Sequence, residues 1–244
     1  MGRCYIFDVD GTLTEPREKM NPKFAKQFVK WSQVRRARGD YFYIATGSDF
    51  SKTKQQLPQE VLDIFDGIFC CMGNELRDSS GKILKRSKFI IPDDLSADLE
   101  RILVDSEYTP KTGTHIEFRT GMVNFSTVGR NASTKTRKAY NKWDSKHLER
   151  QQIADYINKN YPNLEASVGG SISIDIIEKG KDKGQIIPWL IDKGFSNIIF
   201  FGDRCFEGGN DWGIVRELQK CNVIHQWFNI DGPSLILPLL NTLK

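Results

Sequence analysis

A short apolar run that ends in two closely spaced carboxylates constrains this chain more than any other feature. The run is Cys4-Tyr5-Ile6-Phe7, and Asp8-Val9-Asp10-Gly11-Thr12 follows it. Apolar or aromatic residues before a glycine-containing turn are typical of a buried strand. A parallel strand buried on both faces delivers its carboxyl end to the crevice where α/β folds bind ligands. Two acids there need a partner charge, and Mg²⁺ with a phosphate ester supplies it.

The segments on either side of this motif alternate between strand-like and helical patterns. Such alternation predicts the α/β class, with a Rossmann-like, doubly wound parallel sheet as the core. In the first part of the chain, strands are predicted over residues 4–8, 41–45 and 65–71, and helices over 22–38 and from Ser48 or Asp49 to Gln56. After Gly180, a helix is predicted over 183–193, strands over 197–201 and near 221–225, and a last helix from Gly232.

The pattern of strands and helices changes in the middle of the chain and predicts an α+β unit inserted into the sheet domain. Strict alternation over His115–Arg130, with a turn at Thr120-Gly121, predicts an antiparallel hairpin. The other predicted elements are short strands at 83–84 and 89–91, helices over 93–107 and 131–160 with a break near Asp144-Ser145, and a strand over 171–176. The sheet domain is therefore predicted over residues 1–80 and 183–244, and the inserted unit over residues 81–182.

The composition argues against a membrane protein and against a nucleic-acid-binding protein. The chain has 244 residues, of which 39% are hydrophobic and 27% charged, as expected of a globular protein. The first 20 residues contain no signal-peptide core, and no segment reaches the ~18 apolar residues of a membrane span, so we expect a cytoplasmic protein without membrane partners. A net charge of +4 is too small to indicate nucleic-acid binding. The five cysteines have no metal-type spacing.

Three further signals accompany the pair of acids. Thr46-Gly47-Ser48 follows a predicted strand, where a hydroxyl and backbone N–H groups can face a phosphoryl oxygen. Lys183 begins a predicted helix, where its charge opposes the helix dipole unless it faces an anion. Asp203 ends another predicted strand, and Asp211 lies in the glycine-rich loop after it. Carboxylates at several strand ends of one sheet predict a shared Mg²⁺ site.

The order of these motifs resembles that of the haloacid dehalogenase superfamily of phosphoryl-transfer enzymes. Within it, the chain is most similar to the eukaryotic-type phosphomannomutases. The resemblance implies that residues 1–80 and 183–244 form the catalytic core and that the inserted unit, residues 81–182, is an α+β cap domain. The strings that carry this resemblance are Asp8-Val9-Asp10-Gly11-Thr12-Leu13-Thr14, Gly113-Thr114-His115-Ile116-Glu117-Phe118-Arg119, residues 121–130, residues 169–175, and Phe200-Phe201-Gly202-Asp203 with Gly208-Gly209-Asn210-Asp211. The resemblance covers residues 4 to 211, and the strings in the cap are the more discriminating ones.

The resemblance implies a role for each matching residue. Asp8 is the nucleophile that becomes an aspartyl phosphate, Asp10 is the general acid/base, and Lys183 and Ser48 offset charge on the transferring phosphoryl group. Mg²⁺ is expected on Asp8, the backbone carbonyl of Asp10 and Asp203, with Asp211 nearby. The substrate contacts implied by position are Arg17 in the core and Arg119, Arg130, Arg137, Ser173 and Asp175 in the cap.

The implied activity is the interconversion of mannose 6-phosphate and mannose 1-phosphate, with action on glucose phosphates as well, supplying GDP-mannose synthesis. A hexose 1,6-bisphosphate, such as glucose 1,6-bisphosphate, is the implied activator, and a homodimer through the cap is the implied assembly. The chain departs from the family pattern at Lys181, where an aromatic residue is usual, and at Arg204-Cys205-Phe206-Glu207. The alternatives are a sugar-phosphate phosphatase of the same superfamily, a non-catalytic binding protein on an enzyme scaffold, and a nucleic-acid binder.

Overall fold

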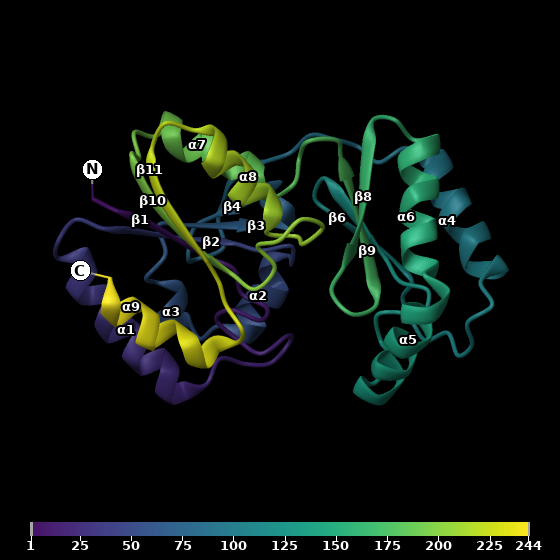
Figure 1. Cartoon of the computed structure of the whole chain (residues 1–244), viewed down its shortest axis with the longest axis horizontal. Helices are drawn as coiled ribbons and strands as arrows, with labels where there is room; N and C mark the ends of the chain where they lie inside the picture. Colours follow the sequence, from purple (N-terminus) through teal and green to yellow (C-terminus); the bar gives the residue numbers. More distant parts are fainter. Residues whose placement is uncertain (1, 244) are drawn as a thin grey trace. The chain divides into compact units, whose positions relative to one another are not determined.

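Two β-sheets organise the chain, and each belongs to a separate unit (Figure 1). The structure is a computed structural model that describes residues 2–243. The first unit, the core, runs to Arg86 and resumes at Lys181, and the second, the cap, comprises Ser87–Gly180. The sequence-based boundaries of 80/81 and 182/183 differ from these. Residues 83–86 stay with the core because they form a strand that pairs within its sheet.

The core sheet has the strand order of a doubly wound fold. Its strands are β1 (Cys4–Phe7), β2 (Tyr41–Ala45), β3 (Gly67–Cys70), β4 (Glu75–Arg77), β5 (Ile83–Arg86), β10 (Asn197–Gly202) and β11 (Ile224–Asn229). They are arranged β11-β10-β1-β2-β3-β4-β5. Pairing is parallel from β11 to β3 and antiparallel for β4 and β5. The predicted α/β class with a parallel-rich central sheet is confirmed.

Helices cover both faces of this sheet because its central strands are apolar on both sides. The helices of the core are α1 (Pro22–Arg36), α2 (Phe50–Gln56), α3 (Gln59–Leu62), α7 (Ile186–Asp192), α8 (Trp212–Lys220) and α9 (Ile236–Thr242). On one face, α7 and α8 pack on β1 and β10. On the other, Phe28 of α1 meets Phe7 edge to face, with ring centroids 5.3 Å apart. Helix α9 lies alongside α1 (Figure 1).

Neighbouring parallel strands bring the predicted acids to one edge of the sheet. Phe7 of β1 pairs in register with Phe201 of β10. Asp8 and Asp203, which follow these two strands, therefore lie at the same edge of the sheet. Gly11 makes this approach possible. Its φ is +83°, and a Cβ at this position would lie 2.5 Å from Oδ2 of Asp203. The glycine of the opening motif is therefore required by backbone conformation and by space.

The cap contains a four-stranded antiparallel sheet and three helices. Its strands are β6 (Ile116–Arg119), β7 (Met122–Phe125), β8 (Leu164–Gly169) and β9 (Ser173–Glu178), and its helices are α4 (Asp93–Asp105), α5 (Thr134–His147) and α6 (Glu149–Asn160). The strand order is β6-β7-β9-β8. One face of this sheet packs its apolar side chains against α4 and α6. Because side chains alternate along a strand, polar residues such as Asn124 and Asp175 lie on the opposite face.

Several predictions about the cap were wrong in detail. Strand β8 was missed, and residues 89–91 form no strand; Phe89 and Ile91 instead pack on the cap core, while Ile90 is exposed. The break in the long helical region is at Leu148, which has a left-handed φ of 54°, and not at Asp144-Ser145. Asp144 instead accepts a hydrogen bond from the backbone N–H of Arg150, at 2.9 Å, in the first turn of α6.

Two predictions about the last part of the core also need correction. Lys183 begins a 3₁₀ turn, Lys183–Gln185, and the α-helix α7 starts only after it. The strand near residues 221–225 lies further along, at Ile224–Asn229, because Ile224 is the residue that pairs with Asn197 of β10. Across the described part of the chain, no helix combines the length and the apolarity that a membrane crossing requires.

Each unit has its own hydrophobic core, so a substitution in the cap core should destabilise the cap locally. Leu99 of α4 is fully buried in the cap core, so Leu99→Ala should cost about 2–5 kcal/mol of unfolding free energy. Hydrogen exchange should show lost protection in α4, β7 and β9. Val104→Ala on the exposed side of the same helix should stay within about 0.5 kcal/mol of wild type. Equal effects of the two substitutions would contradict the assigned core.

Candidate active site

A buried lysine lies between two carboxylates at the edge of the core sheet. Nζ of Lys183 donates hydrogen bonds to Oδ1 of Asp8 and to Oδ1 of Asp211, both at 2.7 Å. Lys183 is 0% exposed and Asp8 is 2% exposed. Burial works against the charged lysine, but the two carboxylates outweigh it and raise the pKa of Lys183 above its ordinary value. The ammonium therefore stays charged and fixes the position of Asp8.

Three carboxylates converge around this lysine and form a site that suits a divalent cation. The ligand oxygens of Asp8, Asp203 and Asp211 lie within 4.8 Å of one another. Burial, and then the charge of Asp211, raise the pKa of Asp203 to about 6. Burial also raises the pKa of Asp8, with further contributions from Asp211 and Asp203, against the opposing effect of Lys183. One ammonium leaves an excess of negative charge, and a set of oxygen ligands fits a hard cation such as Mg²⁺.

Asp211 has less freedom to bind a metal than the other two acids. Its Oδ1 accepts from Lys183, and its Oδ2 accepts from the backbone N–H of Arg204 at 3.1 Å. Each oxygen keeps some capacity as an acceptor, but both are already committed to a donor. Asp8 and Asp203 are therefore the better direct ligands, and Asp211 is better suited to holding Lys183 and the loop after β10.

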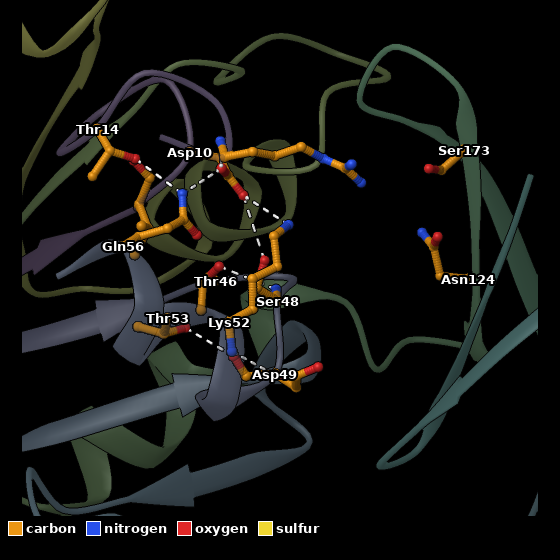
Figure 2. Close-up of polar contacts among 12 residues, drawn as sticks. Asp10, Thr14, Thr46, Ser48, Asp49, Lys52, Thr53, Gln56, Asn124 and Ser173 are labelled. Atoms are coloured by element: carbon orange, nitrogen blue, oxygen red, sulfur yellow. Dashed lines mark hydrogen bonds and ion pairs between the residues drawn. The ribbon is translucent and has the colours of Figure 1, made fainter. Parts of the chain in front are cut away.

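Asp10 lies outside the three-carboxylate cluster, and four groups surround its carboxylate. Three of them, from Gln56, Ser48 and Lys52, are labelled in Figure 2. Oδ1 accepts from Nε2 of Gln56 at 2.8 Å and from the backbone N–H of Arg17 at 2.7 Å. Oδ2 lies 3.4 Å from Oγ of Ser48 and 3.5 Å from Nζ of Lys52. Burial tends to raise the pKa of Asp10, but Lys52, the Arg17 N–H and Gln56 outweigh it and hold the pKa below its usual value.

The loop after β2 is held in place by an unusual backbone segment. Ser48 donates its backbone N–H to Oγ1 of Thr46 at 3.1 Å. The carbonyls of Ser48 and Thr46 accept from the N–H groups of Cys71 and Met72, at 2.9 and 3.1 Å. Cys71 and Met72 have left-handed φ values of 51° and 60°, which are uncommon for residues other than glycine. This conformation supports the loop that carries Ser48.

In the cap, one carboxylate holds two of the predicted arginines. Glu117 forms ion pairs with Arg119 and with Nε of Arg130, the latter at 3.2 Å. Arg137 donates to the backbone carbonyls of Ala132, at 2.8 Å from Nε, and of Arg130. Burial, and after it the charge of Arg130, lower the pKa of Arg137. Three guanidinium groups with one interposed carboxylate leave a positive excess that suits a phosphate.

The polar face of the cap sheet places two further predicted residues close to these arginines. Oγ of Ser173 accepts from Arg130 at 2.7 Å, and Oδ1 of Asp175 accepts from Nδ2 of Asn124 at 2.6 Å. Asn124 and Asp175 are directly paired across β7 and β9. Asn124 and Ser173 are both labelled in Figure 2. A hydroxyl and a carboxylate on one face of β9 are suited to sugar hydroxyl groups.

Comparison with known proteins places this chain in a family. A family model described as eukaryotic phosphomannomutase matches residues 32–226. The chain belongs to the eukaryotic phosphomannomutase family. It is 33% identical over 237 residues to phosphomannomutase 1 of Dictyostelium discoideum, which covers 94% of this chain and 91% of that protein. It is 35% identical over 219 residues to the phosphomannomutase of Saccharomyces cerevisiae, covering 86% and 83%.

Solved structures with low sequence identity show that this fold is shared more widely. The C-terminal domain of trehalose-6-phosphate phosphatase from C. albicans superposes with a TM-score of 0.67 at 16% identity, covering 99% of this chain and 91% of that one. The sucrose-phosphatase of Synechocystis sp. gives a TM-score of 0.59 at 15% identity, covering 99% and 98%. At such identities the likeness shows the fold alone, and the phosphomannomutase family is indicated by the sequence relatives.

The structure brings the predicted residues together in two groups, one in each unit. The core group contains Asp8, Asp10, Arg17, Ser48, Lys183, Asp203 and Asp211, and the cap group contains Arg119, Arg130, Arg137, Ser173 and Asp175. Sequence reasoning assigned no role to Lys52, Gln56, Glu117 and Asn124. Signals for them existed: Lys52 and Gln56 are four residues apart on one helix, and Glu117 alternates with Arg119 along a strand.

Removing the buried lysine tests this arrangement of charges. Lys183→Met leaves Asp8 and Asp211 buried beside each other without their shared cation, which should cost about 3–5 kcal/mol of unfolding free energy. Chemical denaturation followed by circular dichroism measures the change. The matched control is Lys181→Met, at an exposed position two residues away, which should stay within about 0.5 kcal/mol of wild type. An unchanged stability of Lys183→Met would contradict the ion pairs described here.

Proposed function

We propose that this protein is a phosphomannomutase that interconverts mannose 6-phosphate and mannose 1-phosphate, and that it also acts on glucose phosphates. The observation that carries the proposal is the fully buried Lys183 bonded to Asp8 and Asp211. This contact holds one carboxylate at the end of β1 in a fixed position beside a buried ammonium, which suits an aspartyl nucleophile. Membership of the phosphomannomutase family supports the choice of substrate.

Asp8 is the proposed nucleophile. Its Oδ1 is bonded to Lys183, so Oδ2 is the oxygen that we assign to attack on phosphorus. In the first half of the reaction, the phosphoryl group of phospho-Asp8 passes to a hydroxyl of the hexose monophosphate and a hexose 1,6-bisphosphate results. The bisphosphate then reorients, and Asp8 accepts its other phosphoryl group. Lys183 and Ser48 are placed to offset charge on the transferred group.

Asp10 is the proposed general acid/base. It takes the proton of the sugar hydroxyl when that oxygen attacks phospho-Asp8, and it returns a proton when the sugar oxygen leaves. Its contacts with Arg17, Gln56, Ser48 and Lys52 support this assignment, because a carboxylate that transfers protons must be held in one orientation.

The cap residues are the proposed ligands of the phosphate that is not transferred and of the sugar. Arg119, Arg130 and Arg137 offer guanidinium groups, which suit a phosphate bidentately. Ser173 and Asp175 are the proposed partners of the sugar hydroxyls. A mutase needs such a second phosphate site because its intermediate carries two phosphates, whereas a phosphatase does not. The cap arginines therefore favour the mutase.

The proposed cofactor is Mg²⁺, held by Asp8, Asp203 and the backbone carbonyl of Asp10, with Asp211 beside them. When bound, it would neutralise charge on the phosphoryl oxygens. The proposed activator is glucose 1,6-bisphosphate or its mannose analogue, which phosphorylates Asp8 before the first turnover. We further propose a cytoplasmic enzyme that supplies mannose 1-phosphate for GDP-mannose synthesis and forms a homodimer through the cap. No disulfide links the cysteines of the described residues, which supports a reducing compartment.

A coupled assay of mannose 1-phosphate conversion tests this function. With Mg²⁺ and glucose 1,6-bisphosphate, wild type should form mannose 6-phosphate, and Asp8→Asn should lose at least about 10³-fold in rate because the nucleophile is gone. Asp192→Asn, an exposed carboxylate on α7, is the matched control and should keep the wild-type rate. Chelation by EDTA should abolish the activity, and added Mg²⁺ should restore it.

Phosphate release decides between the mutase and the phosphatase. Stoichiometric release of inorganic phosphate from mannose 1-phosphate without the bisphosphate, and without formation of mannose 6-phosphate, would replace the proposed function by sugar-phosphate hydrolysis. Equal rates for wild type and Asp8→Asn would reject the nucleophile. Conversion that persists after complete chelation would reject the metal site.

A further inference from the structure

The side chain of Gln56 connects Asp10 to a second side chain, that of Thr14. Gln56 is the last residue of α2 and is 4% exposed. Its Nε2 donates to Oδ1 of Asp10 at 2.8 Å and to Oγ1 of Thr14 at 3.1 Å (Figure 2). Its backbone carbonyl accepts from the N–H of Met20 at 2.8 Å, which anchors this end of the helix. The side chain thus connects a rigid element to the carboxylate of Asp10.

The orientation of this amide is determined by charge. An amide with its oxygen toward Asp10 would place two acceptors against each other, so Nε2 must face the carboxylate. The other end of the amide, Oε1, is buried and has no hydrogen-bond partner among the described residues. An unpartnered buried carbonyl costs free energy. A role in packing alone does not explain why Oε1 is buried without a partner. A requirement that Nε2 donate a hydrogen bond to Asp10 does explain it.

The two carboxylate oxygens of Asp10 have different contacts and therefore different roles. Oδ1 receives two short hydrogen bonds, from Gln56 at 2.8 Å and from the Arg17 N–H at 2.7 Å. The contacts of Oδ2 with Ser48, at 3.4 Å, and with Lys52, at 3.5 Å, are longer. Two donors pointing at Oδ1 leave no place there for a transferable proton. The proton must therefore be carried by Oδ2.

We propose that Gln56 is a positioning residue, which holds the carboxyl group of Asp10 so that Oδ2 is the atom that exchanges a proton with the sugar oxygen. This inference rests on the proposed function, because it assigns Gln56 a part in that same proton transfer. When Asp8 is phosphorylated by a hexose bisphosphate, a bond forms between the Asp8 oxygen and phosphorus. The bond between phosphorus and the sugar oxygen breaks, and that oxygen takes the proton from Oδ2 of Asp10.

A choice of phosphoryl donor separates this role from a merely structural one. Acetyl phosphate transfers its phosphoryl group with acetate as the leaving group, which departs as a stable anion and needs no proton. A hexose 1,6-bisphosphate leaves through an alcohol oxygen, which does need one. Loss of the Asp10 orientation should therefore slow phosphorylation by the hexose bisphosphate and spare phosphorylation by acetyl phosphate. A distorted or unfolded site would slow both.

The experiment measures the rate of phosphorylation of the Mg²⁺-loaded enzyme by rapid acid quench and mass spectrometry, with acetyl phosphate and with glucose 1,6-bisphosphate as donors. Gln56→Met keeps the size of the side chain and removes the donor. We expect it to lose about 10²-fold with glucose 1,6-bisphosphate, the lower end of general acid–base contributions, and to stay within about two-fold with acetyl phosphate. Gln55→Met, the exposed neighbour on the same helix, is the matched control and should match wild type with both donors.

Every outcome of this experiment bears on the inference. An equal loss with both donors, or no loss with the bisphosphate, rejects the positioning role of Gln56. If Gln56→Met does not fold, Gln56→Asn gives the same test, because its amide is one methylene too short to reach Asp10 from the same backbone. Wild type that accepts a phosphoryl group from acetyl phosphate but not from either hexose bisphosphate would reject the proposed function itself, and the inference with it.

Discussion

The contact on which the site depends is the pair of 2.7 Å hydrogen bonds from Lys183 to Asp8 and Asp211. A buried ammonium and two buried carboxylates are stable only together, because each would otherwise lack compensation for its lost hydration. Residues from opposite ends of the sequence are thereby brought to one point. The same contact orients Asp8. With Asp203 nearby, three carboxylates share one ammonium, so negative charge is in excess. Asp211 also accepts a hydrogen bond from the backbone N–H of Arg204 and so fixes the loop that follows β10.

The doubly wound sheet explains why these residues meet. Parallel strands β1 and β10 are neighbours, and their carboxyl ends carry Asp8 and Asp203. Helix α2 follows the next strand, β2, and its residues Gln56 and Lys52 contact Asp10. Ligand sites of open α/β sheets lie at this edge for the same topological reason. In the cap, alternation along antiparallel strands separates an apolar face, which packs on helices, from a polar face with Arg119, Ser173 and Asp175.

Sequence reasoning reached the α/β core and the acids at strand ends, because a local pattern encodes each of them. It failed where a contact with a distant part of the chain decides whether a segment forms a strand. Strand β8, with the sequence Leu-Glu-Ala-Ser-Val-Gly, has low strand propensity and is formed by its pairing with β9. Phe89 and Ile91 are apolar because they pack on the cap core, and residues 89–91 pair with no strand in the described part of the chain. The helical spacing of Gln56 and the alternation of Glu117 with Arg119 are local signals, but the fold is needed to show that Gln56 contacts Asp10 and that Glu117 contacts the cap arginines.

The central claim is that Asp8 is the residue that carries the phosphoryl group, and chemical localisation tests it most directly. Enzyme incubated with mannose 1,6-bisphosphate and Mg²⁺ is quenched, reduced with borohydride and digested for mass spectrometry. An acyl phosphate on aspartate is converted by this reduction to homoserine. We predict homoserine at position 8 and unmodified aspartate at positions 10, 203 and 211. Homoserine at any of those other positions, or a phosphoryl group on a serine or histidine with Asp8 unchanged, would contradict it.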